Sequence, residues 1–298
     1  MSPPPLHGTS SARPEASAGA LAWWVALIAL VAHLGFVPGV SGGVGGHELL
    51  NYDDPQVVAL ARERSVAEIL TSTTYYAYKP LYFLSLKLDV LLDADGAGLG
   101  HVVNLLLFAL AALLLVRLLA ALTGSRWIAF GAGVLFAVHP VHVESVAWLS
   151  GRKDVLSLVL VLLAHLAYRR ARSLGRVPLL APLLLALGGL TKGTVWTWAG
   201  LFVVDEALEA RRPGSQGAGA ALARLLPSLL VAAGGILMDA SIGARAGPGA
   251  VDHGVPTSAL AAAMAGVFAD YLRLVLAPVG LTIDHDVDPA GSWAAPGA

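Results

Sequence analysis

Long apolar runs separated by short groups of charged residues dominate this sequence. Apolar segments at about 20–39, 101–122 and 222–238 each approach the roughly 20 residues that an α-helix needs to cross the hydrocarbon core of a bilayer. Two more apolar segments begin at Trp127 and cover about 154–168. The pattern predicts an all-α, polytopic membrane protein.

The two remaining apolar segments are less regular. The run 177–206 is long enough for one tilted helix, but GGLTKG interrupts it, and we interpret it as two short helices that meet at Lys192. The stretch 257–281 contains Asp270 and Arg273 and fits either a span or a helix on the membrane surface. With 257–281 on the surface, the chain has about seven spans.

The segment 40–99 predicts helices that lie on the membrane surface, because its apolar residues recur at helical spacing and charges interrupt every run. Its tyrosines suit an interfacial aromatic belt. Residues 1–19 are rich in Pro, Ser and Ala and predict a disordered tail before a transmembrane domain over 20–298. The apolar run that follows the tail is long for a signal peptide, so we interpret it as an uncleaved first helix.

Composition supports the membrane class. The chain is 56% hydrophobic and 13% charged, with a mean hydropathy of +0.71 and a net charge of −1. Nothing in this balance indicates a nucleic-acid partner. The absence of cysteine excludes disulfides, thiolate catalysis and cysteine-based metal sites. No P-loop or GxGxxG motif is present, so neither ATP nor NAD is implied.

Basic residues in short loops predict the orientation, because they remain on the cytoplasmic side. Alternating spans place eight arginines on one side: Arg126, Arg169, Arg170, Arg172, Arg176, Arg211, Arg212 and Arg224. That side and the N-terminus should be cytoplasmic. The segment 40–99, the HPVHVES stretch, Lys192 and the loop 239–256 then share the external side.

The external side also collects ionisable residues that are functional candidates, because charges at membrane depth or at helix ends are costly unless they are paired or solvated. The acids are Glu48, Asp53, Asp54, Glu144 and Asp154, and the bases are Lys79, Arg152, Lys153 and Lys192. The topology therefore predicts one polar cavity at the external membrane face.

Asp53 and Asp54 precede Pro55, which disfavours helix at Asp54 and predicts a turn that opens a surface helix. Two adjacent carboxylates suit a general base and a substrate or metal contact. The alternative is that Asp54 only caps the helix that begins at Pro55.

The motif His139-x-x-His142-x-Glu144 has side chains that a divalent metal accepts, but not in a standard metal-binding spacing, and Pro140 interrupts a regular helix. We favour a loop in which Glu144 and one histidine point into the cavity. The alternatives are a divalent metal site, or two interfacial histidines beside a capping glutamate.

Arg152, Lys153 and Asp154 stand where a helix re-enters the membrane. Asp154 suits the first turn of that helix because of the helix dipole. Arg152 and Lys153 are external, against the orientation bias, and a phosphate at the membrane surface would explain them. Lys192 suits the same role, and its alternative is to extend along apolar surface to the interface.

Five segments together resemble the GT-C class of integral-membrane glycosyltransferases. The likeness is to the membrane portion of the transmembrane and tetratricopeptide-repeat O-mannosyltransferases and their bacterial relatives. The resembling segments are LNYDDPQVV, YKPLYFLSLKLDVLL with GHVVNLLLFALAALLL, FAVHPVHVESVAWLSGRKDVLS, LALGGLTKG and YLRLVLAPVGLTIDHDV. They extend from about residue 49 to 287, and the HPVHVESVAW…RKDVLS block is the most specific.

The resemblance implies a polyprenyl-phosphate monosaccharide as donor, a protein or glycan hydroxyl as acceptor, and inverting transfer without a cofactor at the external face of a bacterial inner membrane. It implies Asp53 or Asp54 as the base and Glu144 as a further acid. The donor phosphate would contact basic residues near the cavity: Arg152, Lys153, Lys192 and Lys79. His139, His142 and Asp154 would line the cavity.

Two features depart from the family. Tyr78-Lys79-Pro80 stands where relatives usually have Trp-His-Pro, which puts any role of that histidine in doubt. Relatives also usually continue with further spans and helical repeats, so we expect the chain to be incomplete at its C-terminus. Outside this class, a membrane transporter or a non-catalytic membrane scaffold fits the same charged residues between spans. The lack of an internal repeat weakens the transporter hypothesis.

The predicted orientation is testable with reporter tags. Tags at positions 124 and 215 should be cytoplasmic and tags at 60 and 248 external, because the arginine-rich loops remain inside. Accessibility of each tag in intact cells measures this. A cytoplasmic tag at position 60 would contradict a single external cavity.

Overall fold

The computed structural model describes residues 14–36, 53–74, 77–93, 97–212, 217–245 and 257–280. Its α-helices are α1 (Pro14–His33), α2 (Asp54–Glu63), α3 (Val66–Thr71), α4 (Pro80–Leu92), α5 (Ala97–Thr123), α6 (Arg126–Val138), α7 (Val143–Ala147), α8 (Arg152–Ser173), α9 (Leu180–Gly189), α10 (Ala199–Glu209), α11 (Ala218–Arg245) and α12 (Thr257–Leu276). Four 3₁₀ turns, η1 (Leu34–Phe36), η2 (Pro140–His142), η3 (Leu149–Gly151) and η4 (Gly193–Trp198), join some of them. The predicted all-α class is confirmed.

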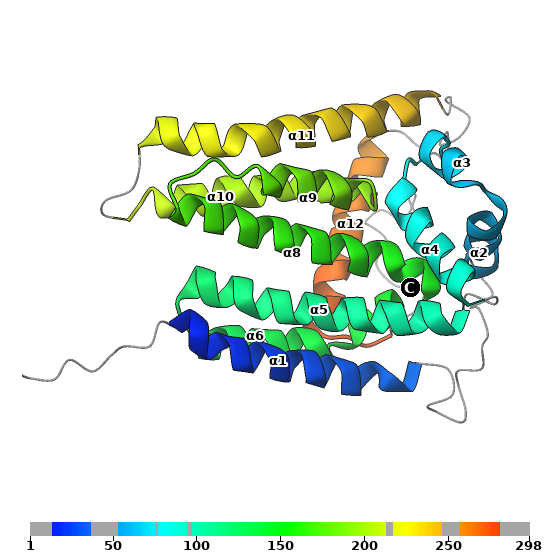
Figure 1. The fold of residues 1–298 in the computed structure, drawn as a ribbon, viewed down its shortest axis with the longest axis horizontal. Helices are drawn as coiled ribbons and strands as arrows, with labels where there is room; N and C mark the ends of the chain where they lie inside the picture. The colour runs from blue at the N-terminus through cyan, green and yellow to red at the C-terminus, as the bar shows by residue number, and fades with distance from the viewer. Residues whose placement is uncertain are drawn as a thin grey trace, which may run out of the picture.

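Helices α1, α5, α6, α8, α9, α10 and α11 lie side by side in an elongated bundle (Figure 1). Between α1, α5 and α6 the core consists largely of small side chains, including Ala29, Ala111 and Ala129, which are fully buried. Small residues let helix backbones approach closely, which is how helices associate where water supplies no hydrophobic force. Around α8 to α11 the core is larger and aromatic, with Tyr168 stacked on Phe202.

The outer surface of the bundle is apolar. Trp23, Leu135 and Leu237 are each 70% exposed, and many other large apolar side chains on these helices are exposed as well. Water-soluble monomers rarely expose apolar surface on this scale. Together with the apolar helices, this identifies a membrane protein.

The predicted count of seven spans is not confirmed. Within the described residues, Gly98–Thr123 and Ala218–Arg245 are long and apolar enough to cross a membrane. A third span results if Arg126–Val138 and Pro140–Ala147, which are bent by 54° at the break between them, count as one. Helix α9 does not qualify because it has only 10 residues, and the 22-residue α8 does not qualify because it has charges at both ends.

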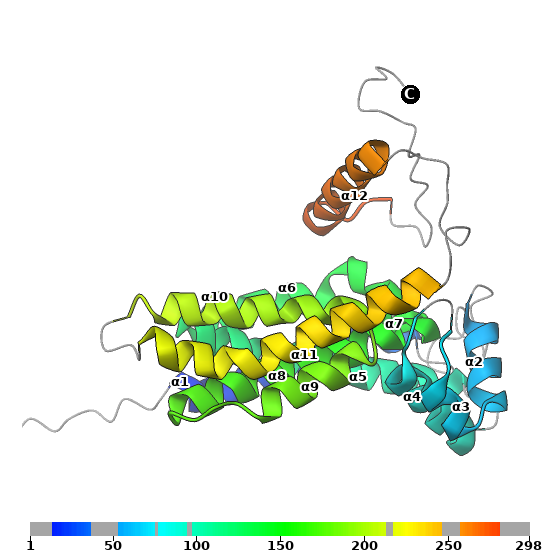
Figure 2. The same cartoon turned by 90° about the horizontal axis from the view of Figure 1, so that it is seen from above.

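The described part of the segment 40–99 forms a cap of three short helices, α2, α3 and α4, at one end of the bundle (Figures 1 and 2). A capping box begins α3: Glu68 N–H donates to Ser65 Oγ, and Ser65 N–H donates to the Glu68 carboxylate. Lys87 of α4 donates to two carbonyls at the end of α2, those of Ala61 and Arg64. The predicted helices are present in this segment, and their place on the membrane surface stays a prediction.

The prediction that 177–206 forms two short helices is also confirmed. Helix α9 ends at Gly189, and Lys192 is the N-cap of η4, which continues into α10. Gly189 and Gly235 lie so close to the Trp196 ring that a Cβ atom at either position would overlap it. These glycines therefore let α9 and α11 pack on both sides of one tryptophan.

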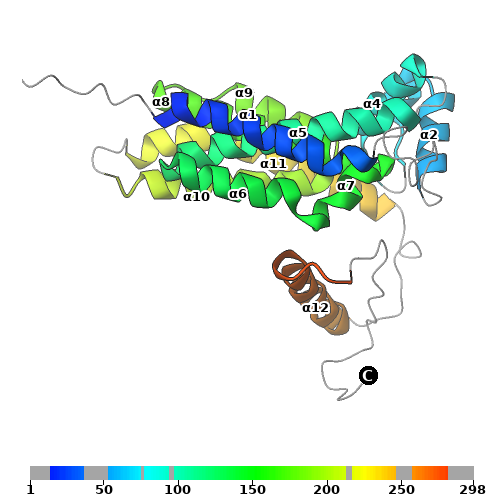
Figure 3. The same cartoon turned by 90° about the horizontal axis from the view of Figure 1, so that it is seen from below.

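Both ends of the chain differ from the predicted boundaries. Helix α1 begins at Pro14 and not near residue 20, so residues 14–19 are helical and do not belong to a tail. The rest of the predicted tail lies outside the described residues. Helix α12 lies apart from the bundle (Figures 2 and 3), and His139 Nε2 is 2.9 Å from the Val275 carbonyl oxygen. Helix α12 has 20 residues and ends at Leu276, before the predicted limit at 281.

A buried ion pair fixes the cap to the bundle. The guanidinium of Arg152, at the start of α8, donates to Asp89 of α4 at 2.6 Å and to the Gly100 carbonyl of α5 at 2.8 Å. It also donates to Asn104, whose amide donates to the Trp148 carbonyl at 2.9 Å. Burial raises the pKa of the Asp89 carboxyl, and Arg152 opposes that rise. Three helices therefore meet at one charged contact.

Replacing Arg152 by Met should destabilise the fold. It leaves Asp89 buried without its cation, and breaking a buried pair in this way costs about 3 kcal/mol or more. Thermal unfolding of the purified protein in a neutral detergent measures the effect. Lys153→Met is the matched control, because the neighbouring Lys153 is only half-buried. Equal unfolding midpoints for the two variants would contradict this role of Arg152.

Candidate functional site

Three lysines from distant parts of the chain meet where the cap joins the bundle; we call Lys79, Lys153 and Lys192 the lysine cluster. Burial lowers the pKa of Lys79, and the charges of Lys153 and Lys192 lower it further. The nearby carboxylates of Asp154 and Asp53 partly oppose this shift. Three of the four bases that the sequence assigned to a phosphate therefore lie close together.

Helix starts position these side chains. Lys79 is the N-cap of α4, which begins at Pro80, and Lys192 is the N-cap of η4. Lys153 and Asp154 occupy the first turn of α8. Because helix N-termini carry partial positive charge and unsatisfied N–H groups, this arrangement favours an anion.

Within the site, the lysines and acids differ in their pairing. Lys192 forms an ion pair with Asp154 across the start of α8. Lys153 lies over the Trp148 ring, with Nζ 5.2 Å from the ring centroid, in a cation–π contact. Asp53 is the N-cap of α2 and is partly exposed, and its side chain makes no capping hydrogen bond. Among the described carboxylates of the site, Asp53 is thus the one that is neither buried nor paired with a lysine.

Asp54 has a different place from its neighbour. It is fully buried, and its carboxylate accepts hydrogen bonds from the backbone N–H groups of Leu149 and Ser150 at 3.2 and 2.8 Å and from Ser150 Oγ at 2.9 Å. These bonds tie the start of α2 to η3. The sequence left two roles open for Asp54, a base or a cap, and the structure shows a third, the attachment of the cap to the bundle.

Arg152 does not join the lysine cluster. The sequence placed it beside the donor phosphate, but its side chain is fully buried and bonded to Asp89, Asn104 and Gly100. Burial of this residue could not be deduced from RKD, because its partners come from two other helices. Only the residue after it, Lys153, reaches the site.

The histidines have packing roles. His142 lies against the rings of Phe108 and Phe136, with centroids 5.4 and 4.3 Å away. Its partner in the motif, His139, accepts a hydrogen bond from Val141 N–H through Nδ1. Glu144 is exposed in the first turn of α7. In the part of the chain that the structure describes, no three His, Asp or Glu side chains are grouped to hold a metal ion; Glu48 lies outside that part.

Sequence reasoning missed a second charged network at the other end of the bundle. There Asp205 and Glu206 of α10 are buried and pair with arginines of α8 and α11. The signal was the run DEALEARR, whose acids match the arginines of YRRARS in number and position along the bundle. His165 of α8 is buried, and its Nε2 lies 3.3 Å from the carboxylate of Asp205 on α10.

The fold and the site define a helical membrane protein with three clustered lysines beside a partly exposed carboxylate. No family model and no solved structure matches the chain. Part of the sequence is similar to curated proteins named protein O-mannosyl-transferase. TMTC1 of Mus musculus is 41% identical over 105 residues, which cover 35% of this chain and 11% of that protein.

Two further relatives extend this similarity. Tmtc2 of Drosophila melanogaster is 41% identical over 100 residues, covering 33% of this chain and 11% of the relative. F38B6.6 of Caenorhabditis elegans, also named a protein O-mannosyl-transferase, is 30% identical over 129 residues, covering 42% and 19%. The matched part thus spans a small fraction of each relative's length. The resemblance inferred from sequence motifs agrees with these names.

The lowered pKa of Lys79 is testable by acylation of its amine at a series of pH values. A lowered pKa leaves more neutral amine at a given pH, so labelling should reach half its maximum below the ordinary pKa of 10.5. Lys153→Met should move that midpoint upward, because it removes a neighbouring positive charge. Mass spectrometry of the labelled peptide gives the midpoint, and a midpoint unaffected by Lys153→Met would contradict the proximity of the lysines.

Proposed function

We propose that this chain is the membrane part of a glycosyltransferase that moves a mannose-like sugar from a polyprenyl-phosphate donor to a hydroxyl group, most simply a protein Ser or Thr. The observation that carries this proposal is the lysine cluster beside Asp53. The names of the similar proteins, protein O-mannosyl-transferases, support both the reaction class and a protein acceptor.

The donor phosphate would bind among Lys79, Lys153 and Lys192. A polyprenyl phosphate places its anionic group at the level of lipid headgroups, and its tail needs an apolar surface such as the outer face of this bundle. When the sugar leaves, negative charge builds up on the departing phosphate. Fixed positive charges aimed at that charge stabilise the transition state. We assign this stabilisation to the lysines and to no metal or cofactor.

Asp53 is proposed as the general base. It accepts the proton of the acceptor hydroxyl while the hydroxyl oxygen attacks the anomeric carbon from the side opposite the phosphate. The bond between the anomeric carbon and the phosphate oxygen breaks, and its electron pair stays with the phosphate. The configuration at carbon is therefore inverted. Glu144 remains the second candidate for the base, because it is exposed on α7.

Buried neighbours hold the proposed groups in place. Asp54 fixes the start of α2 and with it Asp53, while Arg152 fixes the start of α8 and with it Lys153. Their effect on transfer is therefore indirect. This division differs from the expectation that Asp54 and Arg152 themselves contact substrate.

The proposal includes an orientation. The lysine cluster would face the external side of the membrane, in a bacterial inner membrane, and the arginine-rich end would be cytoplasmic. Ala18, near the start of α1, lies beside the arginines, which agrees with a cytoplasmic N-terminus. The positive-inside rule supports this choice, because it places most of the arginines in the cytoplasm. The external lysines are an exception to the rule, and binding of a phosphate would explain them.

Transfer should depend on Asp53. In membranes that contain the full-length protein and a labelled polyprenyl-phosphate sugar, Asp53→Asn should lower the transfer rate about 100-fold or more, as expected for loss of a general base. Glu63→Gln is the control, because Glu63 is an exposed acid at the far end of the same helix. Release of polyprenyl phosphate together with glycosylated acceptor separates transfer from transport.

Three outcomes of that assay would count against the proposal. No transfer by the full-length wild-type protein would refute the enzyme. Full transfer by Asp53→Asn with loss in Glu144→Gln would move the base to α7. A rate that a chelator abolishes would refute the assignment of charge stabilisation to lysines alone.

A further inference from the structure

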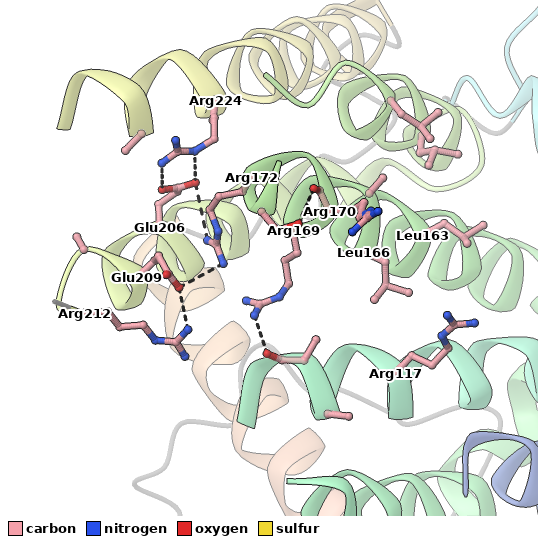
Figure 4. Close-up of a pocket in the computed structure, with 18 of the residues that line it drawn as sticks. Arg117, Leu163, Leu166, Arg169, Arg170, Arg172, Glu206, Glu209, Arg212 and Arg224 are labelled. Atoms are coloured by element: carbon pink, nitrogen blue, oxygen red, sulfur yellow. Dashed lines mark hydrogen bonds and ion pairs between the residues drawn. The ribbon is translucent and has the colours of Figure 1, made fainter. Parts of the chain in front are cut away.

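A large cavity lies at the arginine-rich end of the bundle, at the opposite end of α8 from the lysine cluster. Its volume is about 1120 Å³, and α1, α5, α8, α9, α10 and α11 all contribute to its wall (Figure 4). Along α8, Lys153 is ten residues from Leu163, where the cavity lining begins, and 17 residues from Arg170, which is about 15 Å and about 25 Å at about 1.5 Å per residue. The cavity is therefore not part of the proposed transfer site.

Arginines dominate the lining. Six of them line the cavity: Arg117, Arg169, Arg170, Arg172, Arg212 and Arg224. The acids on the lining are Glu206 and Glu209. The cavity therefore has a surplus of positive charge, and an anionic ligand would be favoured.

The acids account for only some of these arginines. Arg224 forms a two-pronged ion pair with Glu206, both contacts at 2.8 Å. Arg169 pairs with Asp205 at 2.5 Å, and Arg212 pairs with Glu209 at 3.0 Å. These pairs are structural, because they fix α10 against α8 and α11.

Two guanidinium groups on the lining retain capacity for a ligand. Among the described residues, Arg117 and Arg170 form no ion pair or hydrogen bond, and Figure 4 shows both beside Leu163 and Leu166. Deeper in, Arg172 is one-tenth exposed and pairs with Asp205, Glu206 and Glu209 at 3.3, 3.8 and 3.6 Å. Arg172 therefore belongs with the arginines that fix α10 against α8.

The rest of the lining is apolar. Leu163, Leu166, Leu180 and Leu184, here called the leucine wall, line the cavity together with alanines of α5. Arg117 is exposed six residues before the end of α5, an apolar helix of 27 residues. A cation at that depth in a membrane needs an anion or a path to the interface. An amphiphile with a phosphate head and apolar chains satisfies both the arginines and the leucines.

We propose that this cavity binds an anionic glycerophospholipid, with its phosphate held by Arg117 and Arg170 and its acyl chains on the leucine wall. One guanidinium group can donate two parallel hydrogen bonds to the oxygens of a phosphate. Two arginines on adjacent helices could therefore bind the same phosphate. The proposal is independent of the transfer reaction. It assigns a lipid site to the leaflet on the arginine side.

The test uses the full chain purified in a neutral detergent, with bound lipid counted by native mass spectrometry and stability followed by thermal unfolding. Phosphatidylglycerol should bind and raise the unfolding midpoint more than phosphatidylcholine of the same chain length. In Arg117→Gln/Arg170→Gln, phosphatidylglycerol should bind about tenfold more weakly or worse, since two charge-assisted contacts are lost. Arg126→Gln is the matched control, because Arg126 is exposed at the same end but does not line the cavity.

Any of the following outcomes would overturn the proposal. Equal binding of the two lipids, or unchanged phosphatidylglycerol binding in the double variant, would remove the phosphate contact. Stabilisation by inorganic phosphate alone to the same extent would indicate a free-anion site. Tighter binding of a polyprenyl phosphate would assign the cavity to the donor lipid. If the double variant does not fold, Arg170→Gln alone gives the comparison.

Discussion

The ion pair between Arg152 and Asp89 is the contact on which the candidate site depends. Its guanidinium has no exposure to solvent and also bonds to Gly100 and Asn104, so one side chain joins α4, α5 and α8. Loss of one partner of such a pair strongly destabilises the fold, because the other charge then stays buried without a partner. The pair therefore fixes α4, α5 and α8 relative to one another next to Lys153, which is a residue of the candidate site.

The two ends of the bundle use positive charge differently. At the cap end, lysines stand at helix starts and are partly exposed, so they suit a mobile phosphate group that arrives and departs. At the other end, most of the arginines that line the cavity are paired with acids of α10; among the described lining residues, Arg117 and Arg170 are the arginines without an ion pair. Helix α8 links both ends: Asp154 in its first turn and arginines in its last turn each suit the local sign of its dipole.

Much of the fold was predictable because its causes are local. The break at Lys192 follows from GGLTKG, and the turn that starts α4 follows from Pro80, which fixes backbone geometry within a few residues. Of the four bases that the sequence placed on one side, Lys79, Lys153 and Lys192 lie near one another, whereas Arg152 pairs with Asp89. The count of seven spans was not confirmed, because apolar composition does not reveal that α9 is only 10 residues long.

The sequence by itself determined an all-α membrane protein, the end of the bundle at which each kind of charge lies, and which residue types could contact a phosphate. Only the tertiary structure decided which charges are buried. Asp54 and Arg152 have the same local appearance as Asp53 and Lys153, yet their partners are 96 and 63 residues away along the chain. Burial of a charge depends on such distant partners, and these are brought together by helix packing rather than by neighbouring residues.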